Sequence, residues 1–92
     1  MIPSFLERKV FDEEQPVTVK YLRGVLQITQ KQLANLAHVD VSTIKRAESA
    51  NNSIRYATAL RLINALNDEL HKKEYLREEK TLELRNVAMH VS

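Results

Sequence analysis

The sequence contains no cysteine, a single glycine and two prolines. Without cysteine, disulfide bonds, thiol chemistry and zinc sites built on thiolates are excluded. The scarcity of glycine and proline, in a chain with 43% apolar and 28% charged residues, favours a helical globular domain over a disordered one. No apolar run approaches the length of a membrane span, and the first residues lack the apolar centre of a signal peptide. We therefore expect an all-α cytoplasmic protein without membrane contact.

Groups that support catalysis or metal binding are also sparse. His38, His71 and His90 have no metal-ligand spacing and no paired carboxylate beside them. The sequence has no glycine-rich phosphate loop, and Ser42 has no neighbouring base with an orienting acid. We therefore expect no enzyme activity, no metal and no cofactor.

The net charge of +2 is unevenly distributed along the 92 residues. Residues 17–67 carry seven basic and two acidic side chains, whereas residues 1–16 carry two and four, and residues 68–92 carry five and six. A break is expected before Pro16, because the residue before proline is pushed out of the helical region. We predict an N-terminal extension over 1–16, a basic domain over 17–67 and a charged extension over 68–92. A local positive excess is typical of nucleic-acid-binding modules.

Two short helices separated by a tight turn are predicted between residues 29 and 49. Thr29 and Gln32 have the spacing of a capping box, and the apolar residues that follow at helical spacing are Leu33, Leu36 and Ala37. Asp40 is placed to cap the second helix. Its predicted inner positions are Val41, Ile44 and Ala47, and its predicted outer positions are Ser42, Lys45, Arg46 and Ser49. A polar helix face of this kind can lie in the major groove of DNA, which presents a distinct donor and acceptor pattern for each base pair.

With these residues the sequence resembles the Xre/Cro family of phage and bacterial repressors over roughly residues 17–67. The matching positions are Leu22-Arg23, Thr29-Gln30, Leu33-Ala34, Val39, Ser42-Thr43-Ile44 and Glu48. His38 stands where the family usually has glycine in the turn, and Ala50-Asn51-Asn52 replaces the glycine after the second helix. We expect His38 and one of the two asparagines to take the left-handed conformation, in which both residue types are enriched. The resemblance implies an all-α, lambda-repressor-like domain of four or five helices.

The second helix of the motif supplies the candidate base-reading residues, which are Val41, Ser42, Thr43, Lys45 and Arg46. Arg46 is the strongest candidate, since a guanidinium can donate to guanine O6 and N7 together. Lys45 suits either a base or a phosphate. Val41 is predicted to contact a thymine methyl group, to complete the core, or to do both.

The candidate phosphate contacts lie at the start of the first motif helix and in the loop after the second. They are Gln30, Lys31, Asn51, Asn52, Ser53 and Arg55. Gln30 has exposed helix amides beside it, which suit an anion, and the loop roles are implied by the resemblance. The resemblance also implies a salt bridge between Arg23, on the preceding helix, and Glu48.

Three further helices follow from caps and periodicity. One lies within residues 1–14, with Ser4 and Glu7 as a capping box and Phe5, Leu6 and Val10 on one face. Another starts at a Thr18 cap with Tyr21, Leu22, Val25 and Leu26 inward, and its Gly24 suggests the close approach of a neighbouring helix. The last spans 54–66 with Tyr56, Leu60, Ile63 and Leu66 inward. The charged residues 68–80 favour a solvated continuation of that helix, and residues 81–91 fit a bulged strand and a helix equally well.

The resemblance implies a regulator, in the first place a repressor, that binds a palindromic operator in double-stranded DNA as a homodimer. The flanks, residues 1–14 and 68–92, are the candidate dimer surfaces, because a minimal domain of this kind does not need them. The C-terminal flank also holds extra apolar residues, which are Leu82, Leu84, Val87, Met89 and Val91. One alternative is the antitoxin of a toxin–antitoxin pair, which would bind a toxin protein through a flank. Another is a protein-interaction module that has lost DNA binding.

Overall fold

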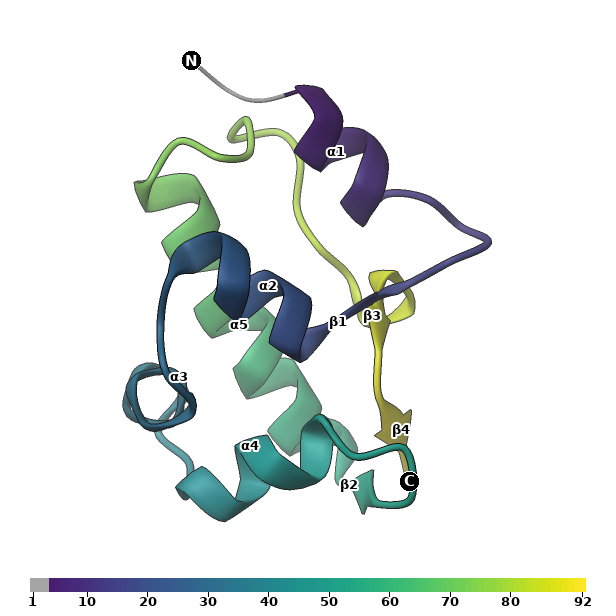
Figure 1. The fold of residues 1–92 in the computed structure, drawn as a ribbon, viewed down its shortest axis with the longest axis vertical. Helices are drawn as coiled ribbons and strands as arrows, with labels where there is room; N and C mark the ends of the chain where they lie inside the picture. Colours follow the sequence, from purple (N-terminus) through teal and green to yellow (C-terminus); the bar gives the residue numbers. More distant parts are fainter. Residues whose placement is uncertain (1–3) are drawn as a thin grey trace.

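Helix α5 (Tyr56–Lys72) is the longest helix of the fold (Figure 1). The computed structural model describes residues 4–92. The elements before α5 are α1 (Ser4–Val10), β1 (Val17–Thr18), α2 (Val19–Leu26), α3 (Gln30–Ala37), α4 (Val41–Ala47) and β2 (Ser53–Ile54). The elements after it are the 3₁₀ turn η1 (Leu84–Asn86), β3 (Val87–Ala88) and β4 (His90–Val91). Helices α2 and α3 pack against α5, while α4 packs mainly against α3. The prediction of a small all-α domain is confirmed, with two-residue strands as its additions.

Side-chain caps fix where three of the helices begin. Thr18 Oγ1 accepts a hydrogen bond from the Tyr21 amide at 2.9 Å, and Asp40 Oδ1 accepts one from the Ser42 amide at 3.1 Å. At Thr29 the capping box is complete, because Gln32 Oε1 also accepts from the Thr29 amide at 2.8 Å. These bonds satisfy amides that the first turn of a helix leaves without partners. The three predicted caps are confirmed.

The turn after α3 uses the left-handed conformation, as predicted, since His38 has φ 58°. Among the described residues, the other non-glycine positions with positive φ are Gln27 and Glu74. The expectation for Asn51 or Asn52 is therefore wrong. The loop after α4 turns through its side chains instead, because Ser49 Oγ accepts hydrogen bonds from the Asn51 amide and the Asn52 side chain.

The core is continuous from α1 to β3. Its largest fully buried side chains include Leu6, Leu22, Leu26, Leu33, Ile44, Leu62, Leu66, Leu70, Leu76 and Leu82. Both flanks thus contribute to the same core as the central domain. The charged segment continues α5 only to Lys72, and the chain then turns, with Lys73 Nζ donating to the Leu26 carbonyl at 2.7 Å.

Four packing expectations are wrong. Phe5, Leu36 and Tyr56 are 62%, 41% and 57% exposed, and a Cβ on Gly24 would meet nothing within 4 Å. Helix α1 buries its i, i+4 pair Leu6 and Val10, so Phe5 points away, while α3 uses its small residues against its neighbours. Tyr56 begins α5 at the edge of the molecule, and the buried position there belongs to Ile54. The side chain of Ser4, predicted to cap α1, lies outside the described residues.

The C-terminal tail runs along the side of the molecule as an extended strap (Figure 1). Strand β3 pairs in parallel with β1 in the register Val17↔Val87, and β4 pairs in parallel with β2 in the register Ser53↔His90. Neither the helix nor the bulged strand predicted for 81–91 describes this segment, because its two short strands pair with different partners. Leu82 and Val87 are buried, Leu84 and Met89 pack against the core, and Val91 is 38% exposed. Most apolar residues of the tail are therefore buried in the core of the chain or packed against it.

A buried amide fastens the start of this tail to α5. The Asn67 side chain is buried, donates to the Leu82 carbonyl at 2.9 Å and accepts from the Leu82 amide at 2.7 Å. The sequence does not indicate this role, because an asparagine followed by Asp68 and Glu69 gives no local sign of burial.

Within the described residues, no helix is long and apolar enough to cross a membrane.

Candidate nucleic-acid interface

Helices α3 and α4 pack closely across the turn at His38–Asp40. The contact is made by side chains that are small or apolar, and Ala34, Ala37, Ile44 and Ala47 are all buried there. Small side chains let two helices approach, so the alanines fix the spacing of the pair. This packing leaves one face of α4 free.

The free face of α4 is polar and basic. Ser42, Lys45 and Arg46 are exposed, and Val41 and Thr43 are half-buried at the same end of the helix. Val41 packs against the core and is also partly open to solvent, which leaves both of its predicted roles available. The structure thus places the five candidate base-reading residues on or beside one accessible face.

Arg46 is held by a backbone acceptor outside its own helix. Its Nη2 donates to the carbonyl of Ser53, in β2, at 2.7 Å. A guanidinium has five N–H donors, so four remain after this bond is made. The side chain is oriented and still able to donate to a base edge.

An open polar hollow of about 510 Å³ lies beside Arg46, between α4, β2 and the start of α5. It is lined by Thr43, Arg46, Ser53, Ile54, Arg55, Thr58 and Ser92. Asn51, Asn52, Ser53 and Arg55 are exposed at its rim or in the adjoining loop. Thr58 is a polar residue of this hollow that no pattern in the sequence indicates.

Gln30 and Lys31, at the start of α3, differ in how free their side chains are. Lys31 is exposed, whereas Gln30 Nε2 donates to Glu48 Oε1 at 3.1 Å. One N–H of the Gln30 side-chain amide is therefore engaged within the protein, and the residue is half-buried. The sequence offered no signal for this link, because the two residues are far apart in the chain.

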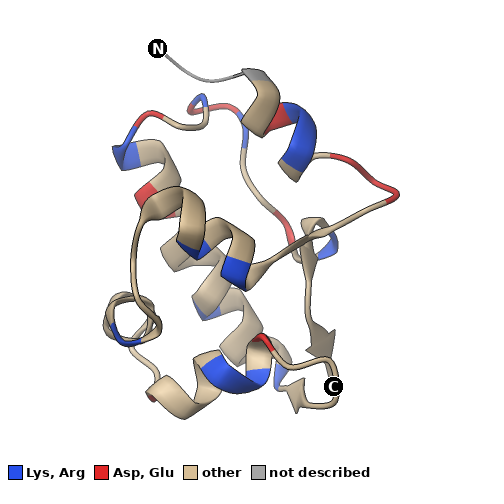
Figure 2. Ribbon diagram, viewed as in Figure 1, with Lys and Arg blue, Asp and Glu red and all other residues tan. Residues whose placement is uncertain are grey.

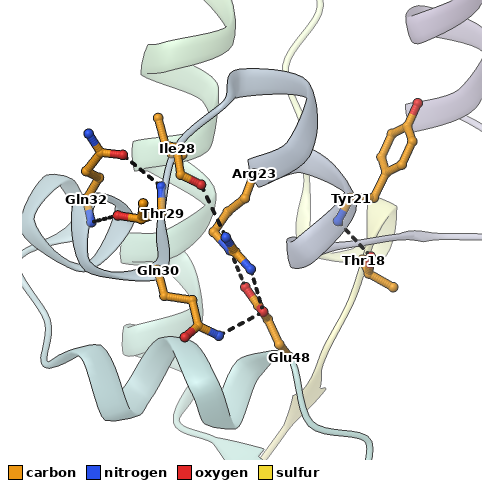
Figure 3. A network of polar contacts seen from close by, with 8 residues as sticks. All are labelled: Thr18, Tyr21, Arg23, Ile28, Thr29, Gln30, Gln32 and Glu48. Carbon is orange, nitrogen blue, oxygen red and sulfur yellow. Dashed lines mark hydrogen bonds and ion pairs between the residues drawn. The ribbon is translucent and has the colours of Figure 1, made fainter.

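Arg23 and Glu48 form the polar connection between α2 and the end of α4 (Figure 3). Arg23 Nε lies 2.6 Å from Glu48 Oε2, and Arg23 Nη2 donates to Glu48 Oε1 at 3.0 Å. Arg23 Nη1 also donates to the Ile28 carbonyl at 3.2 Å. The two side chains are 15% and 10% exposed. The pair is two-pronged and mostly shielded from water, which is the geometry in which an arginine–carboxylate pair is strongest.

The environment shifts the pKa values of both partners. Burial alone would raise the pKa of Glu48, but the hydrogen bonds from Arg23 and Gln30 and the positive charges of Arg23 and Lys20 leave it below its ordinary value. The hydrogen bond to Glu48 raises the pKa of Arg23, against the opposing effect of burial. Both groups are thus held in their charged forms.

Acidic residues are unevenly distributed over the molecule, whereas Lys and Arg occur throughout it, as Figure 2 shows. The basic residues of the α3–α4–β2 surface are Lys31, Lys45, Arg46 and Arg55, and all four are exposed. The acidic residues there are already engaged, since Asp40 caps α4 and Glu48 pairs with Arg23. Most other acidic residues lie in the loops near α1 and beyond α5, away from α4 (Figure 2). The α4 surface therefore presents positive charge with little to offset it.

Two of the histidines take part in hydrogen bonds within the chain. His71 Nε2 lies 2.6 Å from the Lys80 carbonyl, and the His38 carbonyl accepts a hydrogen bond from Arg61 at 3.3 Å. Across residues 4–92, no group of three or more histidine or acidic side chains is arranged to hold a metal ion.

A family model described as helix-turn-helix matches residues 19–70. The match covers α2, α3, α4 and most of α5, which is more than half of the chain. No match was found among curated proteins or solved structures. The matched region contains the α3–α4 pair, the Arg23–Glu48 bridge and the exposed basic face.

Proposed function

This chain belongs to the Xre and lambda-repressor-like helix-turn-helix family, whose members are DNA-binding transcription regulators, and we propose that it represses transcription by reading a specific operator with α4. The observation that carries the proposal is the free face of α4, where Ser42, Lys45 and Arg46 are exposed while Ile44 and Ala47 are buried. An α-helix with this division fits the major groove with its polar face toward the bases.

Within this proposal, Arg46 reads guanine through two parallel hydrogen bonds, and Lys45 contacts a base or a neighbouring phosphate. Ser42 and Thr43 lie near the N-terminal end of α4, the end that enters the groove in this family of motifs. Val41 contacts a thymine methyl group with the part of its side chain that remains open. The exposure of these residues supports the assignment.

Phosphate contacts flank α4 on both sides. Lys31 and the backbone at the start of α3 contact one strand, with Gln30 contributing through the atoms that its bond to Glu48 leaves free. Asn51, Asn52, Ser53 and Arg55 contact phosphates from the other side, next to the polar hollow. These contacts set the position of the protein on DNA and carry no base preference.

Replacing Arg46 with alanine should weaken binding to the preferred duplex by about 1 to 3 kcal/mol and relax the base preference at the position it reads. Lys31→Ala is the matched control, because both residues are exposed cations of the same surface. Lys31→Ala should weaken all sequences similarly and reduce the salt slope by about one unit. Titrations of the preferred duplex and of a scrambled duplex at several salt concentrations measure both effects. Equal losses on the two duplexes for Arg46→Ala would remove it from the base-reading role.

We further propose that the protein acts as a homodimer. One recognition helix covers few base pairs, so two copies on a twofold axis supply the affinity and specificity that an operator requires. Because Leu82 and Val87 are buried within the chain, the apolar tail residues no longer mark the dimer surface. A fragment of residues 1–67 would also lose the buried Leu70, Leu76 and Leu82. Oligomeric state should therefore be judged on the full chain.

A further inference from the structure

The C-terminal strap, residues 87–92, reaches from the body of the molecule to the loop that follows α4. Its first part pairs with β1 and its second part with β2. At its end, the Ser92 amide donates to the Ile54 carbonyl at 2.9 Å, and the Ser92 hydroxyl donates to the same oxygen at 3.3 Å. The strap is therefore hydrogen-bonded to the two-residue strand that Ser53 and Ile54 form.

The same strand holds Arg46. Ser53 pairs in register with His90 of the strap, and the Ser53 carbonyl accepts the 2.7 Å hydrogen bond from Arg46 Nη2. Ile54 anchors β2 in the core, and β2 also contacts α4. A two-residue strand has little stability alone, so the position of the Ser53 carbonyl also depends on the strand that pairs with β2. From these linked contacts we infer that the strap is a positioning element for DNA recognition. It holds the Arg46 guanidinium in position through β2.

Direct packing between the strap and α4 is limited. A hollow of about 290 Å³ lies between the end of α4 and the strap, with Ala47, Ser49 and Ala50 on one side and Ala88, Met89 and His90 on the other. The connection from strap to recognition helix therefore runs mainly through β2 and the Arg46 hydrogen bond.

The physical effect is preorganisation. A free arginine on a helix surface samples many rotamers, and ordering it on binding opposes association. The Ser53 carbonyl restricts Arg46 before DNA arrives and leaves the other N–H groups free to donate. Removing the strap should make β2 more mobile. The Arg46 side chain would then have to be ordered when DNA binds, which would weaken binding.

The end of the strap can be removed with little loss of core. His90 and Ser92 are exposed and Val91 is 38% exposed, whereas Val87 and Leu82 are buried. Deleting residues 90–92 removes β4 and keeps those buried residues. The matched control replaces His90, Val91 and Ser92 with alanine, because it removes the same side chains and retains the backbone that pairs with β2.

The inference rests on the proposed function, and its test is a double-mutant cycle in DNA binding. Deleting residues 90–92 should weaken binding to the preferred duplex by about two- to tenfold, the range that ordering one long side chain corresponds to. The triple-alanine control should bind like the parent chain. In the Arg46→Ala background, the same deletion should have little further effect. Equal losses in both backgrounds, or an equal loss in the control, would overturn the inference.

A second measurement does not require DNA. The side-chain nitrogen resonances of Arg46 in the free protein should show a restricted guanidinium in the parent and control chains and a freely rotating one after the deletion. An unchanged Arg46 spectrum after deletion would overturn the positioning role even if DNA binding fell. If the parent chain shows no sequence preference, the proposed function fails, and the Arg46 spectrum still shows whether the strap orders this side chain. Thermal unfolding of each variant confirms that the comparison is made between folded proteins.

Discussion

Replacing Glu48 with alanine should lower the free energy of unfolding by about 3 to 5 kcal/mol, the range seen when one partner of a buried ion pair is removed. The side chain is 10% exposed and accepts hydrogen bonds from Arg23 Nε and Nη2 and from Gln30 Nε2. Its loss leaves the Arg23 guanidinium largely shielded from water without a counter-charge. Because 10% to 15% of each side chain remains open, the lower end of that range is expected. Denaturant unfolding of the parent and variant chains measures the change.

A double-mutant cycle separates the pair from its two members. Arg23→Met together with Glu48→Met should cost much less than the sum of the single replacements, because no charge is then left without a partner. Arg85→Ala is a matched control, since the Arg85–Glu83 pair has a similar distance of 2.9 Å but is 70% and 62% exposed. It should change the free energy of unfolding by less than about 1 kcal/mol. Strictly additive losses at Arg23 and Glu48 would show that the pair is not coupled.

The bridge also bears on recognition, because it joins α2 to the last turn of α4. Helix α4 has seven residues, which is too short to hold its own orientation by local interactions. Its buried side chains fix one face, and the Arg23–Glu48–Gln30 network fixes its C-terminal end. The stability lost in the single variants is therefore expected to appear together with weaker DNA binding.

Replacing Asn67 with alanine should destabilise the protein by about 2 to 4 kcal/mol. The variant loses two hydrogen bonds and leaves the Leu82 amide and carbonyl buried without partners, at about 1 to 3 kcal/mol for each group. The tail beyond Leu82 should also become more open to hydrogen exchange, since Asn67 fastens its start to α5.

Asn64→Ala is the control for Asn67→Ala, because Asn64 lies on the same helix and is exposed. Its replacement should leave stability nearly unchanged, apart from the small gain in helix propensity that alanine brings. Urea unfolding of both variants makes the comparison. Similar stabilities for the two would mean that the Asn67 hydrogen bonds do not hold the tail.

The features that could be predicted from the sequence are those determined within a few residues. The caps at Thr18, Thr29 and Asp40 depend on side chains that reach amides in the next turn, so their spacing alone indicates them. The left-handed conformation of His38 is expected from the resemblance, because the family usually has glycine at this position of the turn. Periodicity identified the inner residues of α4 because both its buried positions, Ile44 and Ala47, follow the helical repeat.

The features that could not be predicted depend on contacts between distant residues. The strap forms strands only because β1 and β2 are positioned to pair with it, and its own alternation of apolar residues does not show this. The exposure of Leu36 and the burial of Asn67 depend on which elements cover each helix face. At the candidate site, the Gln30–Glu48 and Arg46–Ser53 bonds likewise join residues that no local pattern connects.

Selection of bound duplexes from a random pool by the 92-residue chain tests the central claim most directly. If α4 reads DNA as proposed, the recovered sequences should share a motif made of two inverted half-sites whose centres are about one helical turn, or about 10 to 10.5 base pairs, apart. Selection with the Arg46→Ala variant should recover the same arrangement with one position per half-site relaxed. Recovery of unrelated sequences by the parent protein, with no enrichment over the starting pool at low salt, would contradict the account.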